Sequence, residues 1–242
     1  VAGGSGEAVE LAGLVRGASK GEGLGNQFLA NIRECDAIAH VLRCFESEDL
    51  THVDGSVDPI RDAETIETEL MLADLESLER RYDQVSKRAK TGDRESKEQA
   101  AVMEPIIAAL QDGQPARTVE FAKEQRETVR RLQLLTDKPI MYLCNVDEES
   151  AGTGTEWSSK VTAWAAEQGA ASVTIAAAIE AEVASLPEEE QSEFLESLGL
   201  AEPGLHRVIH AGYGLLGLLT FFTAGPKEAR AWTVRDGAPA PE

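Results

Sequence analysis

The sequence predicts an α/β fold built on a mostly parallel β-sheet. Two short, mainly apolar runs, residues 38–45 and 140–144, have the length and composition of buried strands in a parallel sheet. A long stretch with helical periodicity separates them, and helical and strand patterns alternate after residue 144. This alternation is typical of parallel sheets in which helices connect the strands.

Residues 1–61 are predicted to hold the first part of the sheet. Residues 9–15 fit a short strand, and a Gly-rich segment, residues 17–25, leads into a helix over residues 27–34. The strand at residues 38–45 is followed by a polar loop that ends at Pro59.

Residues 62–136 are predicted to form an antiparallel helical hairpin or small bundle, inserted between two strands. Apolar residues recur at alternating spacings of four and three, which is the heptad pattern of helix-on-helix packing. This seam consists of Met71, Leu75, Leu78, Tyr82, Val85 and Ala89. Residues 91–93 break the first helix, and a second helix ends near Gly113 and Pro115. A third is expected over residues 118–135, with Val129 and Leu132 facing the seam.

The C-terminal part returns to the sheet and then extends beyond it. After the strand at residues 140–144, helices are expected over residues 157–169, 188–198 and 204–217, with a strand over residues 171–176. Two further strands, residues 218–222 and 229–234, are joined by a Gly-Pro turn that is typical of a hairpin.

The composition excludes several classes of protein. Of 242 residues, 42% are hydrophobic and 27% are charged, and the net charge of −20 argues against a generic nucleic-acid binder. Local basic clusters could still meet RNA, although such runs are more often solvated helix faces. These clusters are Arg80-Arg81, Lys87-Arg88-Lys90 and Arg130-Arg131.

The cysteines and the apolar segments indicate a cytoplasmic protein. Three cysteines at no metal-binding spacing argue against a disulfide scaffold and for a reducing compartment. No apolar stretch reaches about 18 residues, so we expect no membrane span. The chain does not begin with Met or with a signal peptide, which suggests a piece of a longer protein. We expect neither a membrane nor sequence-specific DNA as a partner.

The loop after residue 144 has the pattern of a nucleotide base reader. Asn145-Val146-Asp147-Glu148 follows a predicted buried strand, where a P-loop GTPase carries Asn-Lys-x-Asp and its Asp accepts two N–H bonds from guanine. Glu148 stands in place of that Asp, and Val146 in place of the Lys, which favours ATP over GTP. Asn-x-x-Glu is a common tetrapeptide, so its position after the strand gives it weight.

Four stretches, in order along the chain, resemble the YchF (Obg-like) family of P-loop ATPases. They are residues 12–29, 40–46, 51–53 and 221–233. The resemblance implies a P-loop NTPase-type sheet, here incomplete, with an inserted helical antenna and a ubiquitin-like TGS domain. Residues 1–61 and 137–216 would then belong to the nucleotide-binding domain, residues 62–136 to the antenna, and residues 217–242 to the start of the TGS domain.

The resemblance also assigns roles near the phosphates. The family's Asp-x-Ala-Gly motif falls on residues 10–13, so Glu10 would help to hold Mg²⁺, and the Gly13 N–H would reach the γ-phosphate. Glu10 stands where Asp is expected, and the alternative is a plain carboxylate at a strand edge. His52 matches the family's candidate for positioning water, and the alternative is a loop histidine bonded to backbone.

The same resemblance places the base between two segments. The Asn145 side chain would offer a donor and an acceptor to adenine N7 and N6, with Val146 and Glu148 beside it. The third base-pocket segment would be residues 176–178, where backbone groups such as the Ala177 N–H matter most. The three tryptophans, at positions 157, 164 and 232, are expected to pack rather than to stack on a base.

The resemblance implies ATP binding and Mg²⁺-dependent hydrolysis, with the ribosome or ribosomal RNA as partner. No Gly-x-x-x-x-Gly-Lys-Ser/Thr motif occurs in the 242 residues, so we expect this chain alone to be inactive as an ATPase. The alternative is a non-catalytic module that contacts the ribosome or a protein through its helical antenna.

Overall fold

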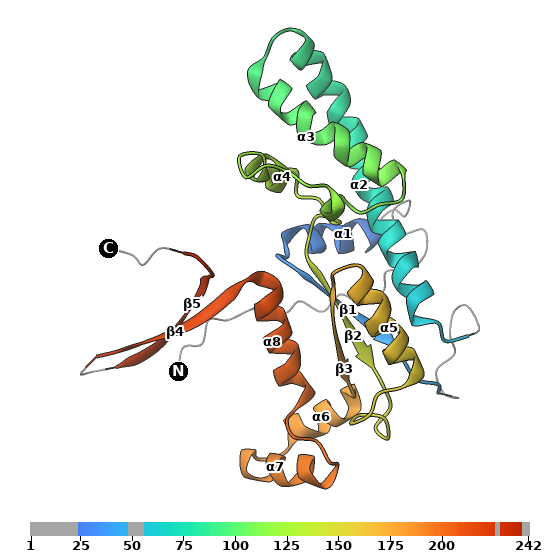
Figure 1. The fold of residues 1–242 in the computed structure, drawn as a ribbon, viewed down its shortest axis with the longest axis vertical. Coiled ribbons are helices and arrows are strands. Elements are labelled where there is room, and N and C mark those ends of the chain that lie inside the picture. The colour runs from blue at the N-terminus through green and yellow to red at the C-terminus, as the bar shows by residue number, and fades with distance from the viewer. Residues whose placement is uncertain (1–23, 48–55, 226–227, 239–242) are drawn as a thin grey trace. The chain divides into compact units, whose positions relative to one another are not determined.

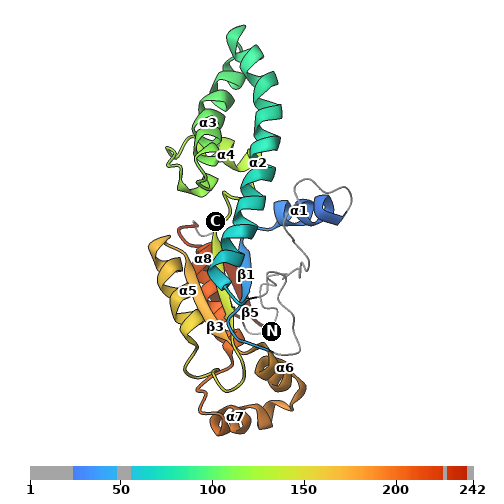
Figure 2. The same ribbon diagram turned by 90° about the vertical axis from the view of Figure 1, so that its right-hand side faces the viewer.

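The computed structural model describes residues 24–47, 56–225 and 228–238. These residues group into two compact units, which Figures 1 and 2 show as ribbons. The sheet unit holds the described residues of Ala39–Ile60 and Ile140–Glu242, and the helical unit holds those of Leu11–Ile38 and Arg61–Pro139.

The three-stranded sheet is parallel, as predicted. Its strands β1 (Ile38–Arg43), β2 (Ile140–Asn145) and β3 (Ala171–Ile175) lie in the order β1-β2-β3. β2 and β3 pair in parallel from Met141↔Ala171 to Asn145↔Ile175. β1 runs alongside β2 in the same direction, because the Ile38 N–H donates to Pro139 O at 3.0 Å and the Cys44 N–H donates to Asn145 O at 2.8 Å. All three carboxyl ends therefore meet at one edge of the sheet.

Helices α5 (Glu156–Glu167) and α8 (Gly204–Leu216) cover opposite faces of β2. The Tyr142 ring lies 4.9 Å from the ring of Trp164 on α5, whereas the Met141 side chain lies against Gly212 on α8. Neighbouring side chains of a strand point to opposite faces, so these two contacts assign one helix to each face. β2 is accordingly buried from Ile140 to Cys144, which explains its continuous hydrophobicity. The expectation of a buried strand was wrong for β1, the outer strand of the sheet, where Val41 is 58% exposed.

Two helices and a hairpin complete the sheet unit. Helix α6 (Ala177–Ser185), formed by alanine-rich sequence that favours helix, was missed at the sequence level. Helix α7 (Glu188–Ser197) precedes α8, and the Glu180 carboxylate accepts from the Gly204 and Leu205 N–H groups at the start of α8. Strands β4 (Leu218–Ala224) and β5 (Ala229–Arg235) pair antiparallel, as predicted for a hairpin. The assignment of this hairpin to a TGS domain stays a prediction.

Helices α2 (Pro59–Lys90) and α3 (Arg94–Gln111) form the antiparallel hairpin that the heptad pattern predicted (Figure 2). The turn between them uses Gly92 at φ +99°, and the Asp93 carboxylate accepts from the Ser96 N–H at 3.0 Å to begin α3. Leu78 is fully buried at the centre of the seam. Its core cluster contains Val102, Met103, Ile106, Leu110, Ala116, Val129, Leu132 and Leu134, with Met71, Leu75, Tyr82 and Val85 packed against it.

The third helix is much shorter than predicted, so the expectation of a helix over residues 118–135 was wrong. A 3₁₀ turn η2 (Ala116–Thr118) is followed by irregular chain and then by α4 (Arg126–Leu132). Gln133 ends α4 in the left-handed region at φ 54°. The next N–H groups bond to a side chain instead of continuing the helix, because Leu135 and Thr136 donate to the buried Asp74 carboxylate at 3.0 and 2.8 Å.

Helix α1 (Leu24–Glu34) packs within the helical unit, although the sequence placed it with the nucleotide-binding domain. Its buried side chains share a small core with α2: Leu29, Ile32, Leu70, Ala73 and Leu135. Its C-terminal end is held by polar contacts as well. The Arg33 guanidinium donates to Gln133 O at 2.9 Å, and the Lys138 ammonium donates to Arg33 O at 2.9 Å and to Cys35 O.

None of the helices in the described ranges combines the length and the apolar character that crossing a bilayer requires.

Candidate functional site

The predicted base-binding residues lie at the carboxyl edge of the sheet, where the loops after β2 and β3 begin. Ligands of open parallel sheets commonly bind at this edge. Asn145, Val146, Glu148 and Ala177 belong to the described residues. The other predicted site residues, Glu10, Gly13 and His52, lie outside them.

Asn145 and Ala177 are brought together directly. Asn145 ends β2 opposite Ile175, and Ala177 begins α6 two residues after Ile175. The Ala177 N–H donates to Asn145 Oδ1 at 2.9 Å, so the first turn of α6 orients the amide. Within the described residues, Asn145 Nδ2 makes no hydrogen bond, which leaves two N–H donors for a ligand acceptor. The sequence predicts that Asn145 offers both a donor and an acceptor to a base. One lone pair of Oδ1 already accepts from Ala177, and the second is left for a ligand donor, so this stays a prediction.

The neighbouring loop residues have different surroundings. Val146 is buried at 3% exposure, and its N–H donates to Ile175 O at 2.9 Å, so it extends the strand pairing rather than presenting a side chain. The Asp147 carboxylate accepts from the Ser150 N–H at 2.8 Å, which folds the loop into a local turn. Glu148 is exposed, so its carboxylate is free of any packing that would prevent ligand contact.

The start of α5 supports this edge from the side of β1. Thr155 and Ser158 form a capping box, and the Thr155 hydroxyl donates to Cys44 O at 2.9 Å. Gly154 precedes them at φ +72°, where a Cβ would lie 2.7 Å from Ser158 Oγ. The Gly-Thr-x-x-Ser pattern at positions 154–158 is a sequence signal of a helix start that could have placed α5 one residue earlier.

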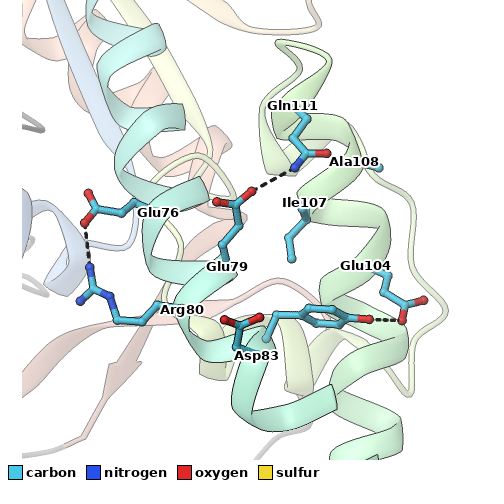
Figure 3. A pocket seen from close by; sticks show the side chains of 9 residues that line it. Glu76, Glu79, Arg80, Asp83, Glu104, Ile107, Ala108 and Gln111 are labelled. Carbon is cyan, nitrogen blue, oxygen red and sulfur yellow. Dashed lines mark hydrogen bonds and ion pairs between the residues drawn. The ribbon is translucent and has the colours of Figure 1, made fainter. Parts of the chain in front are cut away.

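A concavity lies in the helical unit, between α2 and α3, and Figure 3 shows it from close by. Its volume is about 620 Å³, and it is lined by Glu76, Glu79, Arg80, Tyr82, Asp83, Glu104, Ile107, Ala108 and Gln111. Four carboxylates face one guanidinium there, and that guanidinium already pairs with Glu76 at 2.8 Å. A phosphate would be repelled by this surface, so the groove is not a nucleotide site.

The described residues offer no group of three or more metal-ligating side chains. Glu10, the residue that the resemblance assigns to Mg²⁺, lies outside the described ranges, so its role in holding the metal stays a prediction.

No protein-family model matches the chain. The chain is 53% identical over 236 residues to the Ribosome-binding ATPase YchF of Haemophilus influenzae (strain ATCC 51907 / DSM 11121 / KW20 / Rd), which covers 98% of this chain and 65% of that protein. The chain belongs to the YchF family. Relatives with the same name in Escherichia coli O157:H7 and Bacillus subtilis (strain 168) are 50% and 48% identical, with the same coverage of both proteins.

A solved YchF structure has the same fold. The structure of the Schizosaccharomyces pombe YchF GTPase matches 95% of this chain with a TM-score of 0.79 and 34% sequence identity. The match covers 63% of that YchF chain, and the present chain spans 65% of the length of the curated YchF proteins named above. The predicted family and the predicted α/β fold class are therefore confirmed.

Proposed function

We propose that this chain forms the base-binding and helical parts of a YchF-type P-loop ATPase that associates with the ribosome. The observation that carries the proposal is the Asn145 amide, which the Ala177 N–H orients at 2.9 Å on the carboxyl edge of a parallel sheet. The relatives named above are called ribosome-binding ATPases, which supports the same activity and partner for the whole protein. A cytoplasmic location fits this proposal.

The base site would favour ATP over GTP. Asn145 Nδ2 donates toward N7, an acceptor that adenine and guanine share, so Asn145 supplies affinity but little discrimination. Discrimination falls to Glu148, because a guanine reader needs a carboxylate at the distance that Asp provides, and Glu is one methylene longer. The names of the relatives differ on this point, since the Schizosaccharomyces pombe protein is called a GTPase.

The hydrolytic step needs residues outside the described ranges. Glu10 would support Mg²⁺, which neutralises phosphate charge when bound, Gly13 would donate its N–H to the γ-phosphate, and His52 would position the attacking water. The chain contains no Gly-Lys-Ser/Thr loop to hold the phosphates. We therefore expect no Mg²⁺-dependent phosphate release from the 242-residue chain, and turnover that disappears in His52→Ala would contradict this.

The base site can be tested in the chain preceded by a Gly-x-x-x-x-Gly-Lys-Ser/Thr segment. We expect calorimetry to give a lower Kd for ATP than for GTP. Asn145→Ala removes the donors that face N7 and should raise the Kd for ATP by about 5- to 150-fold, which corresponds to roughly 1–3 kcal/mol. Asn31→Ala, the same change on α1, is the matched control and should leave the Kd unaltered. Equal Kd values for ATP and GTP would contradict the preference, and an unchanged Kd in Asn145→Ala would contradict the site.

The alternative, a non-catalytic module that acts through its helices, is supported by the helical unit being compact with its own core. Among the basic clusters, the one at the tip of the hairpin is the best candidate for binding phosphates. Arg80 and Arg131 pair with Glu76 and Glu127 on their own helices, whereas Lys87 and Lys90 make no ion pair within the described part of the chain.

This alternative makes a separate prediction for ribosome binding. If the tip contacts phosphates, cosedimentation of the chain with ribosomes should fall steeply as salt rises, and Lys87→Glu with Lys90→Glu should reduce the salt dependence. The control is Glu127→Lys, a charge reversal at a distance from the tip. Binding that requires nucleotide and ignores the lysine changes would favour the ATPase proposal.

A further inference from the structure

Glu180 joins the first turn of helix α6 to the start of helix α8. Its Oε1 accepts from the Gly204 N–H at 2.7 Å, and its Oε2 accepts from the Leu205 N–H at 3.0 Å. These are the first two residues of α8, and the first N–H groups of a helix have no acceptor within that helix. The N-terminal end of a helix also favours a nearby carboxylate. Both oxygens of Glu180 are thus bonded to α8, and neither contacts a ligand in the site proposed above.

The start of α8 is a fixed point of attachment for Glu180. Gly204 is buried beside the end of β3, where a Cβ would lie 3.1 Å from Ile175 Cγ2 and 2.7 Å from Glu180 Oε1. Further along α8, Gly212 lies against Met141 of β2. Because α8 is held against two strands of the sheet, the Glu180 carboxylate fixes α6 relative to the same strands.

Two polar contacts with other elements hold the first turn of α6. The helix has nine residues, and helices of that length are marginal on their own. Ala176, the residue before it, provides no side-chain cap, so the Ala177 N–H bonds to Asn145 Oδ1 at 2.9 Å instead. The Glu180 N–H closes the same turn on Ala176 O at 3.1 Å. One helical turn therefore connects the Glu180 carboxylate to the bond that orients the Asn145 amide.

Apolar packing does not give α6 this orientation. The buried side chains of α6 are Ile179 and Val183, and the hydrophobic effect has no directional preference. A hydrogen bond weakens steeply when it is misaligned, so the bond from Ala177 to Asn145 needs a first turn that is fixed in direction. The two bonds from α8 to Glu180 fix that direction.

We propose that Glu180 is a positioning residue of the base site, which fixes the Asn145 amide through the first turn of α6. Rotation about the last side-chain bond of asparagine exchanges the places of its oxygen and its NH₂ group. With Ala177 held in place, Oδ1 stays on α6 and Nδ2 stays turned toward the ligand. The effect of Glu180 on affinity rests on the ATP site proposed above, whereas its effect on the bond between Ala177 and Asn145 requires no nucleotide.

The first test measures amide hydrogen exchange by NMR in the nucleotide-free 242-residue chain. Glu180→Ala should speed the exchange of the Ala177 N–H, because the first turn of α6 loses its attachment to α8. Glu180→Gln keeps one oxygen acceptor and should give a smaller increase. The matched control is Glu182→Ala, which removes an exposed carboxylate from the same helix and should leave the exchange of Ala177 unaltered.

A structural role confined to α8 predicts a different pattern. Glu180→Ala would then speed the exchange of the Gly204 and Leu205 N–H groups and leave Ala177 unaltered, and this result would overturn the proposal. Unchanged protection of the β2 amides shows that a variant is folded. If Glu180→Ala does not fold, Glu180→Gln is judged by the same two outcomes.

ATP binding gives the second measurement, in the chain preceded by a Gly-x-x-x-x-Gly-Lys-Ser/Thr segment. Glu180→Ala should raise the Kd for ATP by about 2- to 30-fold, a range typical of residues that act on a site without touching the ligand. If Glu180 acts through Asn145, the double variant with Asn145→Ala should bind ATP no more weakly than Asn145→Ala alone. Additive losses would overturn the proposal. If Asn145→Ala itself leaves the Kd unaltered, the ATP site is wrong, and the exchange of the Ala177 N–H alone decides whether Glu180 positions Asn145.

Discussion

Asp74→Ala should be among the most destabilising substitutions in the helical unit. The Asp74 carboxylate is fully buried and accepts from the Leu135 N–H, the Thr136 N–H and the Thr136 hydroxyl at 2.8–3.0 Å. Each buried donor left without an acceptor costs about 1–3 kcal/mol, so the two backbone donors alone predict a loss of roughly 2–6 kcal/mol. Urea unfolding of the variant and of the wild-type chain measures this difference.

The control is Asp83→Ala, which removes an exposed carboxylate from the same helix and should change the free energy of unfolding by less than about 0.5 kcal/mol. A loss for Asp74→Ala that is no larger than the loss for Asp83→Ala would show that the Asp74 bonds do not hold the chain after α4 in place.

The pH dependence provides an independent check on Asp74. Burial raises the pKa of Asp74 above the ordinary value of 3.8, although the bonds from Leu135 and Thr136 and the nearby Arg33 oppose the shift. The folded state then keeps a proton that the unfolded state has released, so stability is highest below the ordinary pKa and declines as pH rises through the raised one. Asp74→Ala should lack this decline, and a parallel pH profile for both proteins would contradict the assignment.

Leu78→Ala should destabilise the helical unit by about 2–5 kcal/mol, the usual cost of emptying a buried leucine site. Leu78 is fully buried among side chains of α3 and α4, so neighbouring groups cannot fill the space without moving their helices. Hydrogen exchange should show faster exchange in α2 and α3, while β1 and β2 near Val41 and Met141 keep their protection.

Leu72→Ala is the matched control, because Leu72 is 44% exposed on the same helix. It should cost far less than Leu78→Ala. If Leu78→Ala removes protection from the sheet and the helices to the same extent, the two units unfold together, and the division into independent units fails.

The parts of the fold that were predictable are those with a strong periodic signal. The heptad seam placed α2 correctly because Leu78 and its neighbours repeat along one face for several turns. The continuous apolar run of β2 indicated burial on both faces, and in the structure α5 packs on one face and α8 on the other.

Other features depend on contacts between residues far apart in the chain, which local patterns do not carry. Val129 and Leu132 have helical spacing, but α4 stops at Leu132 because Asp74, on another helix, accepts the following backbone N–H groups. Helix α1 has an ordinary amphipathic pattern, which predicts a buried face but not the core against which that face packs.

The candidate site was predictable in its location and not in its geometry. Asn145 and Ala177 were both identified from the sequence. The bond between them was not, because it depends on the parallel pairing of β2 with β3 and on the start of α6 at Ala177. The residue before this helix, Ala176, has no side chain that could cap it, so the sequence contains no signal for the helix start.

The bond from Ile38 N–H to Pro139 O has a consequence for how the length of the helical hairpin can vary in evolution. It closes a loop of about a hundred residues between two adjacent strands, and the entropy of closing a loop grows only with the logarithm of its length. Halving or doubling that loop would change the closure free energy by about 0.6 kcal/mol. Whole turns can therefore be added to or removed from α2 and α3 with little effect on the pairing of β1 and β2, so the reach of the hairpin can evolve independently of the sheet.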